Sequence, residues 1–153
     1  MGLDQYLKVR VYLSNYDSDP ITERKTYDRI IRCTGIKPCE DARYICIEYT
    51  AIYWRKANAI HRWFVDNVQS GRDECQQTRV SREQLEILFN ECIEVLEGTK
   101  KAEKGLPTRS GFLFGSTEYD EHYINSLQYT VDKLSEILYI RQISGDFFYQ
   151  SSW

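Results

Sequence analysis

Hydrophobic and polar residues alternate at the start of the chain. On one side every second position is apolar except Gln5, and the positions between them are polar or aromatic. A period of two is typical of a β-strand with one face on a core. The pattern therefore predicts a strand over residues 2–14, whose inward side consists of Leu3, Gln5, Leu7, Val9, Val11 and Leu13.

A helix and a second strand are expected next. The Asn, Asp, Ser and Pro residues at 15–20 predict a loop. The following segment has Tyr27, Ile30 and Ile31 at helical spacing, and Gly35 is a suitable C-terminal stop. The β-branched and aromatic residues of 42–54 then predict a longer strand.

The period becomes helical again from about Arg55, and this helix is expected to end near residues 69–71. Its apolar stripe is Ala57, Ile60, His61, Phe64, Val65 and Val68. A further helix begins with the capping box formed by Ser81 and Gln84 and ends at Gly98. Its apolar face includes Leu85, Leu88, Phe89, Cys92, Val95 and Leu96.

The last third of the chain predicts a long loop, a helix and a strand. Residues 100–116 form a loop long enough to suggest a function, and its Phe112 and Phe114 are expected to anchor it in the core. A helix is expected to start at Ser116 or Thr117, and residues 146–153 form a final strand. The sequence thus predicts one α+β domain over residues 1–153, with helices packed on a mainly antiparallel sheet.

Composition excludes several classes of protein. A formal net charge of -3 argues against binding bulk nucleic acid through phosphate contacts. The chain contains no apolar run long enough for a transmembrane helix and no secretory signal, so we expect no membrane association and a cytoplasmic protein. Its 12 Tyr residues suit ligand and partner surfaces as well as cores.

Cysteine and histidine spacing gives no support for a metal site. The five Cys residues form no CxxC pair, and the only two His residues, His61 and His122, lie far apart in the sequence. No metal or other cofactor is therefore expected. Cys46 and Cys92 are expected to be small core residues, whereas Cys75 is expected to be more exposed.

The predicted junction of strand and helix near Arg55 is the first candidate binding site. Free N–H groups of a first helical turn, guanidinium groups and an amide suit a phosphate or carboxylate, and two Trp rings could stack on a base. The residues concerned are Trp54, Arg55, Lys56, Asn58, Arg62 and Trp63. The alternative is that the Trp rings belong to the core and the cations form a solvated face.

The loop before the last helix is the second candidate. It offers hydroxyl groups and a cation just before a helix start, a place where anions bind well. These groups are Thr108, Arg109, Ser110, Ser116 and Thr117. It is not a P-loop, because GxxxxGK[ST] is absent. The alternative is a surface loop that ends in a helix cap.

His61 is the first candidate general base, but a lone His on an apolar stripe is usually a core residue. Glu118, Asp120, Glu121 and His122 form an acidic cluster with one imidazole, which could serve acid–base chemistry or hold Mg²⁺. Acidic residues at a helix start are also expected from the helix dipole alone. We therefore assign no catalytic residue, and retain His61 as a residue that could contact a ligand.

Four blocks of the sequence resemble a group of small proteins of undefined activity encoded by bacteriophages and prophages. They are GLDQYL, YWRKANAIHRWFVDNVQ, LPTRSGFLFGSTEYDE and FFYQSSW. The resemblance spans nearly the whole chain and implies an accessory phage protein that acts in the bacterial host cytoplasm. Such proteins often counter host defence, and some sequester nucleotide signals.

Three functional hypotheses follow. In the first, the protein binds a nucleotide-like, phosphate-bearing ligand without turning it over, with Arg55, Lys56 and Arg109 holding phosphates. Asn58 and Ser110 would then orient the ligand. In the second, it is a small hydrolase using His61 or His122 with Glu118 or Asp120. In the third, it inhibits a host defence protein through an exposed surface rich in Tyr. The aromatic C-terminus is expected to dock at the edge of the sheet or against a partner chain, so a homo-oligomer is possible.

Overall fold

The computed structural model describes residues 2–153 and contains one four-stranded antiparallel sheet. Its strands are β1 (Asp4–Ser14), β2 (Tyr44–Arg55), β3 (Thr78–Val80) and β4 (Asp146–Ser152). The order across the sheet is β2-β1-β4-β3, so the first and last strands of the chain are neighbours in the centre. The predicted α+β class is confirmed. The short strand β3 was not predicted, because three residues are too few to show a period.

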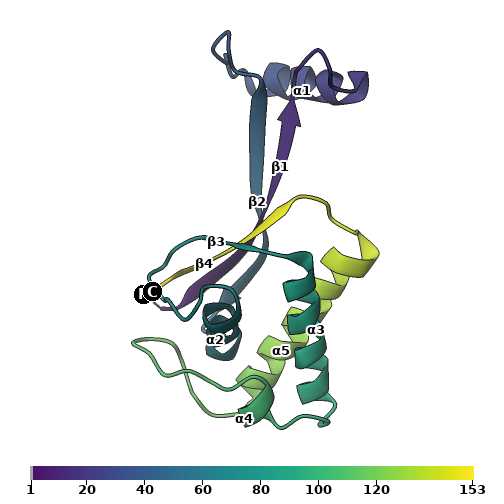
Figure 1. The fold of residues 1–153 in the computed structure, drawn as a ribbon. Helices are drawn as coiled ribbons and strands as arrows, with labels where there is room; N and C mark the ends of the chain where they lie inside the picture. The colour runs from purple at the N-terminus through teal and green to yellow at the C-terminus, as the bar shows by residue number, and fades with distance from the viewer. Residues whose placement is uncertain (1) are drawn as a thin grey trace.

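All helices except the first pack on one side of this sheet (Figure 1). The helices are α1 (Ile21–Thr34), α2 (Asn58–Asn67), α3 (Arg82–Leu96), the short α4 (Ala102–Gly105), α5 (Glu121–Ser135) and the π-helical turn η1 (Glu136–Ile140). The core lies between the sheet and α2, α3 and α5, and includes Leu7, Ile52, Phe64, Leu88 and Leu127. In residues 2–153 no helix has the length and apolar character needed to cross a membrane.

Local sequence signals fix several helix ends. Gly35 adopts a left-handed conformation with φ of 68° at the end of α1, as predicted. The Ser81–Gln84 capping box is present at the start of α3. The start of α5 was predicted wrongly: Asp120, and not Ser116 or Thr117, caps this helix, because its carboxylate accepts a hydrogen bond from the Tyr123 backbone N–H at 3.1 Å.

The predicted start of α2 was also too early. β2 continues to Arg55, whose position in the sheet opposite Asp4 keeps it out of the helix. Lys56 turns the chain with φ of 56°, and α2 begins only at Asn58. Arg55 and Lys56 therefore precede the helix and are not part of its first turn.

The strands β1 and β2 extend well beyond the other two strands. β4 pairs with β1 only from Asp4 to Arg10, so β1 from Val11 onward pairs with β2 alone. Helix α1 lies at the far end of this ribbon, away from the other helices (Figure 1). We call residues 11–47 the arm and the remaining described residues the body. Cys46 lies on the arm and is exposed, which corrects the prediction that it belongs to the core.

Other core predictions have mixed outcomes. Leu88 and Cys92 are fully buried on α3, as expected. Phe89 is only partly buried and packs against Tyr139 with ring centroids 5.3 Å apart. It covers the edge of the core, because it lies beside the inward face of α3 and not in its centre.

Candidate functional site

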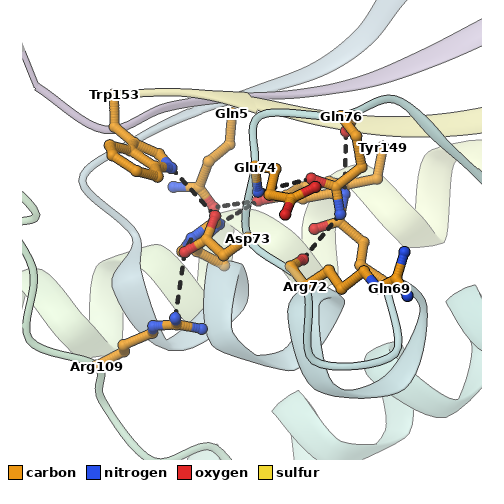
Figure 2. A network of polar contacts seen from close by, with 10 residues as sticks. Gln5, Gln69, Arg72, Asp73, Glu74, Gln76, Arg109, Tyr149 and Trp153 are labelled. Carbon is orange, nitrogen blue, oxygen red and sulfur yellow. Dashed lines mark hydrogen bonds and ion pairs between the residues drawn. The ribbon is translucent and has the colours of Figure 1, made fainter.

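A network of polar side chains joins α2, the two central strands and the loop after α2 (Figure 2). His61 is fully buried on α2. Its Nδ1 lies 2.8 Å from the Tyr149 hydroxyl on β4, and its Nε2 lies 3.0 Å from the Asp73 carboxylate. The Tyr149 hydroxyl is also 3.4 Å from the side-chain oxygen of Gln5 on β1.

Asp73 links this buried pair to the surface. The Arg109 guanidinium lies 3.3 Å from the carboxylate oxygen that contacts His61, and the Trp153 indole N–H donates to the other oxygen at 3.1 Å. Figure 2 shows these two side chains reaching Asp73 from different segments. The network thus fixes the long loop and the C-terminal residue to the body. The C-terminal strand and the Trp153 contacts confirm that the aromatic terminus is docked, but β4 lies between β1 and β3 and not at the predicted sheet edge.

Burial controls the charge of His61. Loss of hydration lowers its pKa below the ordinary value, and the nearby Asp73 carboxylate opposes this effect. A neutral imidazole with its proton on Nε2 donates to Asp73 and accepts from the Tyr149 hydroxyl at Nδ1. The same burial raises the pKa of Tyr149 well above its usual value, so its hydroxyl keeps its proton.

The orientation of Gln5 follows from this arrangement. Its side-chain nitrogen is buried without a partner when its oxygen faces Tyr149. Because the Tyr149 proton goes to His61, the Tyr149 oxygen is free to accept, and an exchange of the amide oxygen and nitrogen lets the Gln5 amide nitrogen donate to it. The network has a structural role. His61 is fully buried within it, so a substrate has no solvent-exposed path to this imidazole.

The long loop is held to α2 by Asn58. This buried side chain donates to the carbonyls of Phe114 and Ser116 at 3.3 and 2.7 Å, and its oxygen accepts from the Arg109 backbone N–H at 3.3 Å. Phe114 is buried against His61, as predicted, with ring centroids 5.2 Å apart. Phe112 is 84% exposed, which corrects its prediction as an anchor: Phe112 points outward at the loop tip while Phe114 turns inward.

Several residues predicted to bind a ligand make hydrogen bonds or packing contacts within the protein. Trp54 is buried on β2 and donates to the Thr130 hydroxyl at 2.9 Å, so its ring face is not open to a base. Arg62 donates to the Thr108 carbonyl at 3.1 Å, and the Thr108 hydroxyl donates to the Thr117 carbonyl at 2.9 Å. For the two Trp rings near α2, the core alternative fits better than stacking, since Trp63 is also buried.

The two arginines expected to share one anion hold different carboxylates. Arg55 pairs with Asp4 at 3.2 Å and lies on the sheet, whereas Arg109 pairs with Asp73 at 3.3 Å on the loop. Neither lies in the first turn of a helix, because α2 begins at Asn58 and α5 begins at Glu121. Exposed Ser110 lies beyond Arg109 in the same loop.

A shallow groove collects the remaining candidates between the β2–α2 junction and the start of α5. One end is a hollow of about 200 Å³ lined by Tyr53, Arg55, His122 and Tyr129. The other end leaves about 10 Å³, room for one water molecule. Ala57, His122 and Ser126 line both ends, and the narrow end adds Lys56, Asn58, Thr108, Ser116, Glu118 and Asp120. We call this surface the junction groove.

The electrostatics of the junction groove are mixed. Ala57, the residue before α2, has no side-chain group that could cap the first N–H groups of the helix. Lys56 and Arg55 supply positive charge beside this uncapped end, while Glu118 and Asp120 supply negative charge. Asp120 is already engaged as the cap of α5. Throughout residues 2–153, no three His, Cys, Asp or Glu side chains come together as a metal site.

Comparisons of the chain with protein-family models, curated proteins and solved structures found no match. The roles assigned to these residues therefore rest on the geometry of this chain. Sequence reasoning missed Gln5, Asp73, Tyr149 and Trp153 as members of the polar network. The one available signal was Gln5, a polar residue on the otherwise apolar side of β1.

Proposed function

We propose that the protein binds a small phosphate-bearing ligand of nucleotide-like chemistry in the junction groove and does not turn it over. In the setting implied by the resemblance to phage proteins, it would sequester a nucleotide signal of host defence. The supporting observation is that six of the predicted ligand-binding residues line this one groove beside the uncapped start of α2: Trp54, Arg55, Lys56, Asn58, Thr108 and Ser116.

The shape of the groove limits the ligand. Sites that bury a drug-sized molecule usually enclose about 300–1,000 Å³, and the wider end of this groove offers about 200 Å³. The wider end therefore suits one phosphate beside Arg55 and the edge of a flat ring against Tyr53 or Tyr129, whereas the narrow end at Lys56 admits only one water molecule. The rest of a larger nucleotide would remain at the surface.

Binding without turnover is favoured by the position of the imidazoles. His61 is sealed inside the polar network and does not line the groove. His122 lines both ends of the groove, and the neighbouring Asp120 carboxylate is engaged by the Tyr123 N–H. A hydrolase would have to rely on His122 with Glu118, which makes the fate of the ligand the decisive measurement.

A melting-temperature screen against inorganic phosphate and mono-, di- and cyclic nucleotides tests the proposal, followed by chromatography of the recovered ligand. A ligand at 100 times its dissociation constant should stabilise the protein by about 2.7 kcal/mol. Recovery of the intact ligand supports sequestration. Conversion that is lost in His122→Gln would identify the hydrolase instead, and no stabilisation by any compound would refute the proposal.

Variants then locate the site. Arg55→Ala and Lys56→Gln should each weaken binding by about 1.5–3 kcal/mol, the contribution of a hydrogen bond to a charged group. Arg79→Ala is the matched control, because Arg79 is also an exposed strand arginine paired with one carboxylate, that of Asp146. Equal weakening by Arg79→Ala would indicate a general effect of charge and not a site.

A further inference from the structure

The outer edge of β2 is a long unpaired strand with little to protect it. β2 is the first strand in the sheet order, so its outer N–H and C=O groups face no other strand of residues 2–153. Natural proteins usually protect such edges with Pro, Lys or covering segments. The segment Tyr44–Thr50 contains neither residue, and it exposes Tyr44, Ile47 and Tyr49 by 61, 38 and 42%.

The charge of this edge is neutralised within the chain. Glu48 is the one ionic side chain between Tyr44 and Thr50, and it pairs with Lys8 at 3.3 Å and with Arg10 at 2.6 Å. A second strand of the same composition is therefore not repelled. A two-stranded ribbon is also marginally stable alone, so the arm gains from a further strand.

We propose that β2 pairs with β2 of a second copy of this chain, in antiparallel register about a two-fold axis at Ile47. This register follows from the two faces of the strand. On one face of the ribbon, Glu48 lies opposite Arg10 of β1. The other face is apolar and consists of Ile45, Ile47 and Tyr49, which lie opposite Leu13, Val11 and Val9 of β1.

A two-fold axis at Ile47 places apolar residues opposite apolar residues on the apolar face. Ile47 lies opposite Ile47 of the second copy, and Ile45 lies opposite Tyr49 of the second copy. On the other face Glu48 lies opposite Cys46, so the two carboxylates do not face each other. An axis at Glu48 would place them directly opposite, which is destabilising. An isologous contact of this kind satisfies both free edges at once.

The same register brings the tip of one arm to the base of the other copy's arm. The irregularity of β2 opposite Leu7 and Lys8 limits regular pairing to Tyr44–Thr50. Beyond it, the second copy's Glu40 and Asp41 would reach a hollow of about 370 Å³ beside Tyr49 that carries Lys133, Arg141 and Glu136. The net positive charge of the hollow complements these two exposed acidic residues.

Sedimentation and light scattering across a concentration series test the contact. The native chain should approach twice its 18.2 kDa mass as the concentration rises. Ile47→Lys should hold it at the monomer mass, since it places two ammonium groups at the axis. Ile87→Lys, at an exposed position of α3, should leave the dimer intact. A native chain that stays monomeric at every concentration overturns the proposal and favours a different protein as the partner of the arm.

Cross-linking tests the register itself. In a background with the exposed Cys33, Cys39 and Cys46 changed to Ser, Ile47→Cys should form a disulfide-linked dimer on mild oxidation. Thr50→Cys on the same strand should not, because its partner across the axis is Tyr44 and the two introduced thiols lie far apart. Efficient linkage by Thr50→Cys without linkage by Ile47→Cys would refute the register.

Discussion

The two ends of the strands β1 and β2 share one sequence pattern and have opposite surroundings. In the body, Leu7 and Ile52 lie side by side and are fully buried under α2 and α5. In the arm, Leu13 and Ile45 lie side by side in the same way, but both remain partly exposed. The difference lies in β4, which stops pairing at Arg10, and in the helices: α2, α3 and α5 cover the body, whereas α1 alone contacts the arm.

This contrast shows that alternation fixes which side of a strand is apolar and does not fix what covers it. In the body the pattern produces a core. In the arm it produces an apolar surface, which is why the arm is the part of the molecule expected to gain most from a partner. Three measurements test this difference between the arm and the body.

The largest difference is expected between two leucines of β1. Leu7→Ala should lower the free energy of unfolding by about 2–5 kcal/mol, because it leaves a cavity in a closed core. Leu13→Ala should lower it by less than about 1 kcal/mol, because solvent already reaches this position. Urea denaturation at low protein concentration measures both. Equal losses would mean that the arm has a core of its own.

A smaller effect on the free energy of unfolding is expected from removing a carboxylate, Asp73 in the body or Asp17 in the arm. Asp73→Ala removes the acceptor of His61, Arg109 and Trp153, and should cost about 1–3 kcal/mol, because it leaves a buried N–H group without a partner. Asp17→Ala in the arm should change stability by less than about 0.5 kcal/mol, since Asp17 is fully exposed and pairs with Arg24 at 3.6 Å. An unchanged free energy of unfolding in Asp73→Ala would show that the network does not stabilise the body.

The smallest effect concerns pH. Because burial lowers the pKa of His61, the unfolded chain binds a proton near pH 6.5 that the folded chain does not. The contribution of neutral His61 to the free energy of unfolding is therefore complete above that pH. It is lost on acidification towards the lower pKa of the folded state, where the free energy of unfolding falls by at most about 1.4 kcal/mol per pH unit.

The free energy of unfolding, measured between pH 5 and 7.5, reports this slope. His61→Gln should flatten it. A slope that survives His61→Gln would place the sensitivity outside the polar network.

The elements could be predicted from the sequence where a local signal existed. Periodicity predicted β1, Gly35 predicted the end of α1, and the Ser81 capping box predicted the start of α3. Each of these signals depends only on residues that are close together in the sequence. The start of α5 was missed because Ser116, Thr117 and Asp120 are all suitable caps, and only the docking of the loop on Asn58 excludes the first two.

The site could be predicted only in part, since it depends on contacts between distant segments. Of the residues predicted at the β2–α2 junction and in the loop, Trp54, Arg55, Lys56, Asn58, Thr108 and Ser116 line one groove. The pairing of Arg109 with Asp73, and the burial of Trp54, depend on the order of the strands and could not be inferred from spacing. The arm was not foreseen, because nothing in β1 marks where β4 ends.

The strand order also constrains how the chain folds as it leaves the ribosome. β4 follows every other element in the sequence but lies between β1 and β3. The arm can form early, because β1, α1 and β2 are consecutive, whereas the body keeps an open central position until β4 has been synthesised. Pairing of β1 with β4 closes a loop of nearly the whole chain, which makes it slow relative to local steps. Until then the apolar side of β1 is available to chaperones and to other nascent chains.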